Sequence, residues 1–220
     1  MPKLKPEEIA LRRREIVEAA RRCFIRSGFH QTTTDEICHE ASITPGGLYH
    51  YFASKEEIIS AVIDDAAHTV VTALSQRATL PDLRSALREV SSFFFESMRD
   101  GGLDSVVRFD IETWAEALRN EKLAEINARA WAMRRDWLEG LIARAKDEGM
   151  YGKDMNPKAL ADLMMAILTG LRVCKVMWGE YFDIEGAMRS LFLMHAGQLV
   201  TNGAVELPEE VVVGPSVGAA

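Results

Sequence analysis

The segment 33–55 constrains the fold most, because it contains three helix-start signals in quick succession. Thr33 and Glu36 have the spacing of a capping box, in which a hydroxyl and a carboxylate each bond an orphan backbone N–H group. Thr44 followed by Pro45 is a second start, since a proline at the first helical position has no N–H group to leave unpaired. Any helix between these two starts must be short.

A third start completes the pattern, because Ser54 and Glu57 repeat the capping-box spacing. Together the signals predict two short helices at 34–41 and 45–52, joined by a turn at 42–44. A longer helix is predicted from 55 onward. Two short helices joined by such a turn are typical of a helix-turn-helix, whose second helix enters the major groove of DNA.

Charge is unevenly spread along the 220 residues. The whole chain has a net charge of −7, yet residues 1–55 hold nine basic and seven acidic side chains, a net charge of +2. Salt screens repulsion beyond about 8 Å, so an acidic protein can bind nucleic acid through basic groups that share one face. The distribution permits a DNA-binding segment at the N-terminal end.

The glycine pair Gly46-Gly47 falls in the first turn of a predicted helix, where each glycine costs about 1 kcal/mol relative to alanine. One explanation is close approach of the backbone to DNA. The other is tight packing against helix 34–41. Taken alone, the glycine pair favours this packing explanation over contact with DNA. Leu48 and Phe52, four residues apart, are expected to face the interior together.

These residues carry a resemblance to a known family. G-F-x-x-T-T-x-x-x-I at 28–37 and A-S-I-T-P-G-G-L-Y-H-Y-F-A-S-K at 41–55 resemble the DNA-binding domain of TetR-family transcriptional regulators, over roughly residues 10–60. Two positions depart from the family pattern. Ser42 stands where the turn usually has glycine, which predicts a positive φ and a strain of about 1–2 kcal/mol, and Cys38 stands where alanine is usual.

The resemblance implies a set of DNA-contacting residues. Thr33 and Thr34 would approach a phosphate or a base edge, a four-residue tip would enter the major groove, and three further residues would contact phosphates. The tip consists of Thr44, Pro45, Gly46 and Gly47. The three further phosphate contacts would be Tyr49, His50 and Lys55. Few of these side chains can make bidentate base contacts, so we predict recognition weighted towards the DNA backbone and its shape.

The rest of the chain also has a helical pattern. Apolar periodicity and turn residues predict helices at 7–27, 55–76, 104–118, 121–148, 157–178 and 184–201, with a further element between Pro81 and Asp100. We therefore expect an all-α protein with a head at 7–55, which includes the start of the linking helix 55–76. A helical ligand-binding and dimerisation domain would follow at 77–202, and a disordered tail at 203–220.

All four tryptophans and many methionines lie after the head. Large apolar residues at helical spacing form either core or the lining of a ligand cavity, and the family resemblance implies a cavity within 80–178. The candidate lining residues are Phe109, Trp114, Trp131, Met164, Met165 and Leu168. Arg108, Glu112 and Arg172 could anchor a polar group of the ligand or form salt bridges at the rim.

Helix 157–178 is apolar almost all round, and helix 184–201 has one apolar stripe. Two such helices could pair with their copies into a four-helix bundle, and the resemblance implies the same homodimer. The predicted interface residues are Leu171, Trp178, Met188, Leu191, Phe192, His195 and Leu199.

Several functional classes lack support in the sequence. Three widely spaced cysteines indicate reduced thiols in a cytoplasmic protein, and no apolar run reaches the roughly 18 residues of a membrane span. The histidines share no metal-ligand spacing, and there is no P-loop, dinucleotide fingerprint or nucleophile elbow. We expect no metal, no cofactor, no catalytic residues, no signal peptide and no membrane association.

The sequence therefore predicts a homodimeric DNA-binding transcriptional regulator. In this hypothesis it is a repressor, released from a palindromic operator on double-stranded DNA by a small, apolar or amphipathic effector that displaces the far end of helix 55–76. Three alternatives stay open: an activator of the same fold, a helical carrier of apolar ligands that does not bind DNA, and an all-helical enzyme.

Overall fold

The computed structural model describes residues 5–80, 82–99 and 102–195. Within them it contains nine α-helices, one short 3-10 helix (η1) and no strand. The helices are α1 (Pro6–Ser27), α2 (Thr34–Glu40), α3 (Pro45–Tyr51), α4 (Lys55–Arg77), α5 (Leu83–Arg99), α6 (Leu103–Ala117), α7 (Glu121–Asp147), α8 (Pro157–Trp178), η1 (Gly179–Tyr181) and α9 (Ile184–His195). The all-α prediction is confirmed. The predicted end of the last helix and the predicted tail lie outside the described residues.

Two of the three predicted helix starts form as expected. The hydroxyl of Thr33 accepts a hydrogen bond from the backbone N–H of Glu36 at 3.2 Å, and the Glu36 carboxylate accepts one from the backbone N–H of Thr33 at 2.7 Å. At the second start, Thr44 Oγ1 accepts from the N–H of Gly47 at 3.1 Å. These bonds satisfy backbone donors that have no partner inside the helix, and they fix the ends of α2 and α3.

The third start differs in one bond from the predicted capping box. Ser54 Oγ accepts from the N–H of Glu57 at 3.3 Å, as expected. The Glu57 carboxylate, however, accepts from the N–H of Ala53 at 2.7 Å, one residue before the N-cap. The glutamate therefore ties α4 to the end of the preceding loop.

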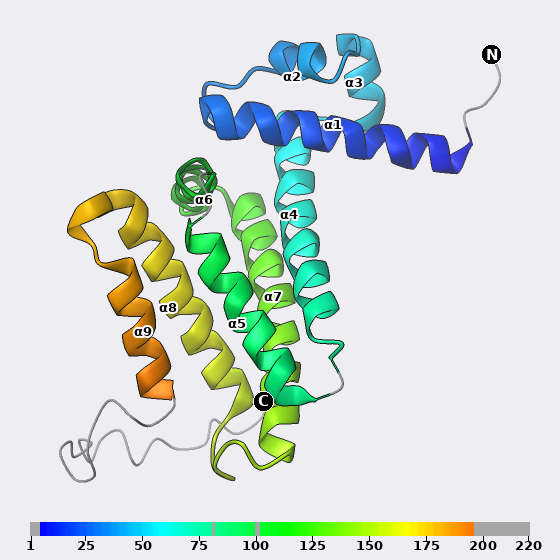
Figure 1. The fold of residues 1–220 in the computed structure, drawn as a ribbon. Helices are drawn as coiled ribbons and strands as arrows, with labels where there is room; N and C mark the ends of the chain where they lie inside the picture. The colour runs from blue at the N-terminus through cyan, green and yellow to red at the C-terminus, as the bar shows by residue number, and fades with distance from the viewer. Residues whose placement is uncertain (1–4, 81, 100–101, 196–220) are drawn as a thin grey trace. The chain divides into compact units, whose positions relative to one another are not determined.

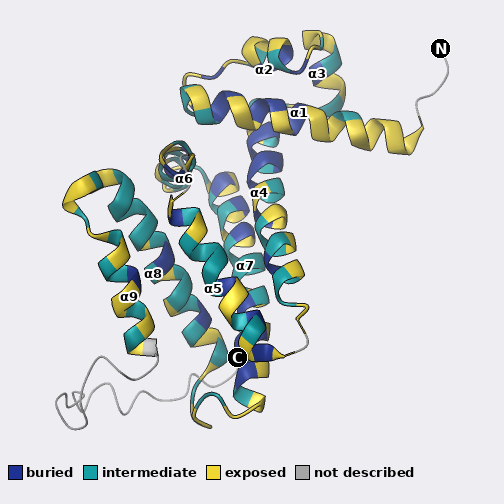
Figure 2. Cartoon of the chain, viewed as in Figure 1, coloured by how far each residue is buried: buried dark blue, intermediate teal, exposed yellow. Residues whose placement is uncertain are grey.

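The head consists of α1 packed across α2 and α3, and α4 leads out of it (Figure 1). Its interior is apolar and closed. Phe24, Ile37, Leu48, Phe52 and Ile58 are each at most 1% exposed, so the prediction that Leu48 and Phe52 share an inner face is confirmed. Figure 2 shows that the buried residues concentrate where α1 meets the start of α4.

The same core continues from the head into the helical body. The rings of Phe24 in α1 and Phe109 in α6 stack with their centroids 5.8 Å apart, and Leu123 and Ile126 of α7 belong to the same buried cluster. Below this junction α4 and α8 both pack along α7. By length and composition α4 could cross a membrane, but its seven buried residues pack in the protein core.

The chain divides into two compact units between Gly179 and Glu180. The first contains α1 to α8, and therefore both the head and most of the body. The second contains α9, in which Met188 is buried and Phe192 and Met194 are exposed.

Candidate DNA-binding surface and effector cavity

The N-terminal tip of α3 projects from the head without a side chain to cover its backbone. Thr44, Pro45 and Gly46 are exposed, and a Cβ atom built on Gly46 would find no atom within 4 Å. Packing within the chain therefore does not explain Gly46. A Cβ on Gly47 would lie 3.3 Å from Thr44 Oγ1, so local crowding accounts for part of the second glycine. Open space at Gly46 suits close approach of another molecule.

The turn before this tip is tied back to α1. Ser42 has a φ of 53°, as predicted for a serine that replaces a turn glycine, and its backbone conformation costs about 1–2 kcal/mol. The Arg12 guanidinium donates to the carbonyl oxygens of Ala41 and Ser42 at 3.3 and 3.2 Å. One arginine of α1 thus holds the turn that sets the orientation of α3.

Further arginines of α1 hold α2 and the end of α3. Arg22 Nε and Arg26 Nη1 lie 2.8 and 3.3 Å from the two carboxylate oxygens of Glu40. The hydrogen bond from Arg22, and then that from Arg26, lowers the pKa of Glu40 below its ordinary value. The guanidinium of Arg13 lies 4.6 Å from the centroid of the Phe52 ring. These basic groups position the helix-turn-helix from within the head.

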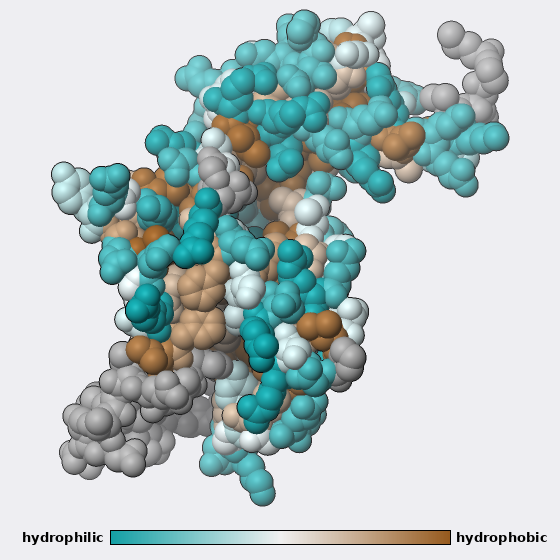
Figure 3. Space-filling model, in the orientation of Figure 1, coloured by the Kyte–Doolittle hydropathy of each residue, from teal (hydrophilic) through white to brown (hydrophobic). Residues whose placement is uncertain are grey.

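The other side chains predicted to contact DNA lie on the surface of the head. Thr33, Tyr49 and His50 are exposed, with Tyr49 at 56%, and Thr34 is half-buried. Figure 3 shows that the visible face of the head is mostly hydrophilic. The placement suits the predicted phosphate contacts, which stay predictions.

Lys55 has a role inside the protein as well. Its ammonium donates to the carbonyl oxygen of Phe29 at 2.7 Å and lies 4.8 Å from the centroid of the Phe29 ring. Burial lowers the pKa of Lys55. The predicted phosphate contact would have to use the remaining N–H groups of this ammonium, which has three donors.

Glu112 of α6 binds the other side of the same loop. Its carboxylate accepts a hydrogen bond from the backbone N–H of Phe29. Gly28 has a φ of 80°, and a Cβ there would lie only 2.7 Å from Glu112 Oε1. Glycine is therefore required both by the backbone conformation and by the approach of the carboxylate. Glu112, one of the possible ligand anchors in the sequence, instead links the head to α6.

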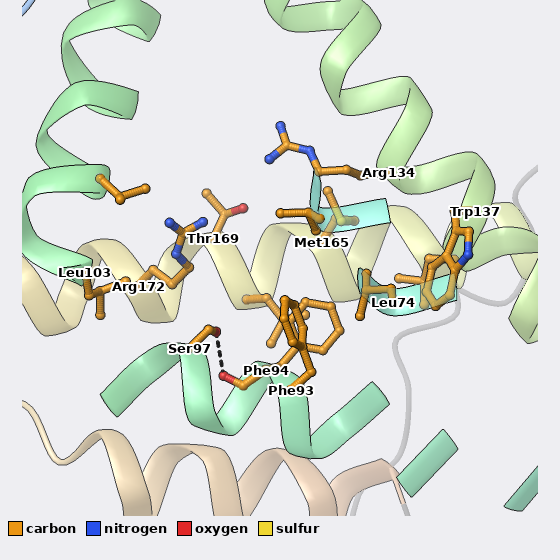
Figure 4. A pocket seen from close by; sticks show the side chains of 14 residues that line it. Leu74, Phe93, Phe94, Ser97, Leu103, Arg134, Trp137, Met165, Thr169 and Arg172 are labelled. Atoms are coloured by element: carbon orange, nitrogen blue, oxygen red, sulfur yellow. Dashed lines mark hydrogen bonds between the residues drawn. The ribbon is translucent and has the colours of Figure 1, made fainter. Parts of the chain in front are cut away.

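The body encloses a cavity of about 200 Å³ among α4, α5, α6, α7 and α8. Figure 4 shows its 14 lining side chains, ten of them labelled. Its apolar lining includes Leu74, Phe93, Phe94 and Trp137, while Arg134, Arg172, Thr169 and Ser97 supply the polar groups. A concave, mostly apolar site with a few polar groups is typical of small-molecule binding.

Two of the six predicted ligand-binding residues, Met165 and Leu168, line this cavity. The other four lie elsewhere. Phe109 packs on Phe24 in the head-to-body core, Trp131 Nε1 donates to Asp162 at 3.5 Å, and Met164 packs on a separate apolar cluster. Trp114 of α6 is half-buried and is not part of the lining. Of the possible polar anchors, only Arg172 lines the cavity, and Arg108 is exposed.

The sequence interpretation missed Arg134, Trp137 and the α4 residues Val70 and Leu74. A signal for Arg134 was present, because it falls on the buried stripe of α7 between Ala130 and Leu138. A charged residue at such a position indicates either a buried ion pair or a polar group in a cavity.

The cavity holds an arginine-rich cluster. Arg172 Nη2 lies 3.6 Å from Asp110 Oδ2, and both side chains are about one quarter exposed, at 27% and 26%. Burial raises the pKa of Asp110, while the charges of Arg172 and Arg134 oppose that rise. Burial also lowers the pKa of Arg134, but an arginine stays protonated at neutral pH.

A stripe of small and apolar residues lies on the outer face of α8. Leu163 is 56% exposed and Met177 61%, and Ala166 and Gly170 are exposed between them. The stripe is opposite the residues of α8 that face the cavity, such as Met165 and Leu168.

Among the predicted interface residues, Trp178 and Phe192 are exposed at 54% and 40%, Leu171 and Leu191 are half-buried and Met188 is buried. The side chain of His195 and the whole of Leu199 lie outside the described residues. The interface assignment stays a prediction.

Fold and surface together define a class of protein: a helix-turn-helix head on a helical body, as in DNA-binding transcriptional regulators. Residues 16–62 match the family model described as bacterial regulatory proteins, tetR family, and residues 83–196 match the C-terminal domain of BetI-type transcriptional repressors. The chain belongs to the TetR family of transcriptional regulators. It is a DNA-binding regulator of a family whose members are usually repressors, bind small-molecule effectors and act as dimers.

Curated relatives and solved structures agree with this assignment. The uncharacterised HTH-type transcriptional regulator YfiR of Bacillus subtilis is 25% identical over 186 residues, which cover 84% of this chain and 88% of YfiR. The regulator BetI of Paraburkholderia xenovorans is 26% identical over 197 residues, covering 86% and 93% of the two chains. A TetR transcription regulator from Haloarcula marismortui has the same fold, with a TM-score of 0.73 and 17% identity over 86% of this chain and 98% of its own.

Proposed function

We propose that this protein is a cytoplasmic, homodimeric repressor that leaves a palindromic operator when a small, largely apolar or amphipathic effector occupies the cavity. The proposal rests on one observation: two helices reach both the cavity and the head. α4 contributes Val70 and Leu74 to the lining, and its first residue, Lys55, binds Phe29. α6 contributes Leu103 and Val106 and holds the same loop through Glu112.

The shared helices supply a route for coupling. A ligand between Leu74 and Leu103 would separate the far end of α4 from α6 and change how both helices hold the loop at Phe29. The head would then turn relative to the body, and the two heads of a dimer would no longer match major grooves about 34–36 Å apart. Because coupling is reciprocal, operator and effector must weaken each other's binding by the same factor.

Dimer formation is argued from α8. The exposed stripe of Leu163, Ala166, Gly170 and Met177 gives this helix an outer face that favours helix pairing. Replacing Leu163 with glutamate should turn the dimer into a monomer in sedimentation velocity. Leu118→Glu is the matched control, because Leu118 is 88% exposed at the end of α6. A dimer in both variants would contradict the α8 interface.

The direct test is DNase footprinting on the intergenic DNA beside the protein's own gene, repeated with a panel of apolar and amphipathic ligands. We expect a palindromic protected site that overlaps a promoter and disappears with an effector. Protection upstream of the promoter, with increased transcription, would instead support an activator. Failure to protect any fragment, together with tight ligand binding, would support a carrier. Unchanged operator affinity at a saturating effector concentration would contradict the coupling mechanism.

A further inference from the structure

The cavity has one positively charged side. Arg134 of α7 and Arg172 of α8 both line it, and the described lining residues include no aspartate or glutamate. In Figure 4 the two guanidinium groups lie on the Thr169 side of the view, whereas Leu74 and Trp137 lie on the opposite side. The cationic groups therefore lie towards one end of the cavity, beside Leu103, and the end at Leu74 and Trp137 is apolar.

The charges of this cluster do not balance. Arg172 pairs with Asp110 at 3.6 Å. Arg134 Nε donates to the carbonyl oxygen of Ala130 at 3.0 Å, and no carboxylate among the residues described forms an ion pair with it. Two cations therefore face one anion, whose ionisation is itself opposed by burial. An uncompensated charge that is partly withdrawn from water is unfavourable, and a bound anion would offset that cost.

We propose that the effector is an amphipathic monocarboxylate whose head group bridges Arg134 and Arg172. The planar fork of a guanidinium matches the two oxygens of a carboxylate. The excess of a single positive charge matches a monoanion and disfavours a dianionic phosphate monoester. The apolar tail would lie against Trp137 and Phe94. This inference rests on the proposed function, because it names the ligand class of that same cavity.

Isothermal titration calorimetry on the full-length protein without DNA tests the ligand class. Octanoate and phenylacetate are compared with octanamide and phenylacetamide, which have the same tails and no charge. We expect each acid to bind more tightly than its amide. Arg134→Met and Arg172→Met should each weaken acid binding roughly tenfold, the loss expected for a charge-assisted hydrogen bond, and leave amide binding unchanged.

Four further variants control for folding and for charge. Arg135→Met removes the neighbouring arginine, which pairs with Asp136, and should change nothing. Arg134→Lys and Arg172→Lys keep the charge and should retain the preference for acids. They provide the test if a methionine variant fails to fold. Asp110→Asn removes the competing carboxylate and should tighten octanoate binding several-fold.

The outcomes separate this inference from the proposed function. If neither acid binds more tightly than its amide, the monocarboxylate class is overturned, and operator release by a neutral ligand would leave the proposed function intact. Equal losses in Arg135→Met and Arg172→Met would overturn the head-group site as well. If octanoate binds through the two arginines but operator affinity does not change, the ligand class is supported and the proposed release mechanism fails.

Discussion

The head and the body place their functional groups in opposite environments. At the tip of α3 the predicted DNA-contacting surface includes the exposed backbone of Gly46, where an added Cβ atom would find no atom within 4 Å. In the body the polar groups of the cavity lie between packed helices: Arg172 pairs with Asp110, and Arg134 donates to the carbonyl oxygen of Ala130. A substitution at the tip of the head can therefore impair function without lowering stability, whereas a substitution in the body is expected to lower both.

The largest effect on operator binding is expected at Gly46. Gly46→Ala should weaken operator binding by about 2 kcal/mol for each head, the cost of one charge-assisted hydrogen bond, and hence by about 4 kcal/mol for a dimer. The new methyl group would hold the backbone away from DNA. Because alanine favours the helix, the free energy of unfolding should rise by about 0.5–1 kcal/mol. Fluorescence anisotropy on operator DNA and urea unfolding measure the two quantities.

Gly140→Ala is the matched control, since Gly140 is an exposed helical glycine on α7 with no atom near its Cβ position. It should gain similar stability and keep full operator affinity. An equal loss of affinity in both variants would show that the tip of α3 is not the DNA-contacting surface.

The next effect concerns Phe109, which the sequence assigns to the ligand and the structure places in the core between head and body. Phe109→Ala should lower the free energy of unfolding by about 3–5 kcal/mol, because the Phe24 ring loses its stacking partner and a cavity remains. Leu118→Ala, at an exposed position just after α6, should change it by less than about 0.5 kcal/mol. A Phe109→Ala protein with normal stability and lost ligand binding would support the sequence assignment instead.

A smaller effect is expected at Glu112, where head and body meet. Glu112→Gln keeps the shape and removes the charge from the hydrogen bond with Phe29, so the free energy of unfolding should fall by about 1–2 kcal/mol. The ratio of operator affinities with and without effector should also move towards one. Glu125→Gln, on the exposed face of α7, is the control. An unchanged ratio in Glu112→Gln would mean that α6 does not take part in coupling.

The same contrast explains how far the sequence could predict the structure. Helix starts depend on local signals such as Thr33, Thr44 and Asn156-Pro157, and these lie at the predicted positions. The DNA-contacting residues could be named because one short segment resembles the family's DNA-binding domain, and they stay predictions. The cavity depends on how faces of five helices converge, and helical periodicity is the same for a core residue as for a lining residue. Phe109 and Met165 therefore have equivalent sequence patterns, yet only Met165 lines the cavity.

The smallest effect is expected at Ser42. It tests whether the strained backbone of this turn is needed to orient α3. Ser42→Gly removes about 1–2 kcal/mol of left-handed strain and adds an entropy cost of about 0.5–1 kcal/mol to folding. The net gain of about 0.5 kcal/mol should raise Tm by roughly 1–2 °C. Ser42→Ala keeps the strain and should leave Tm unchanged. Operator affinity should stay constant in both variants, because Arg12 still holds the carbonyl groups of the turn. A weaker operator complex in Ser42→Gly alone would show that the strained turn, rather than Arg12, sets the position of α3.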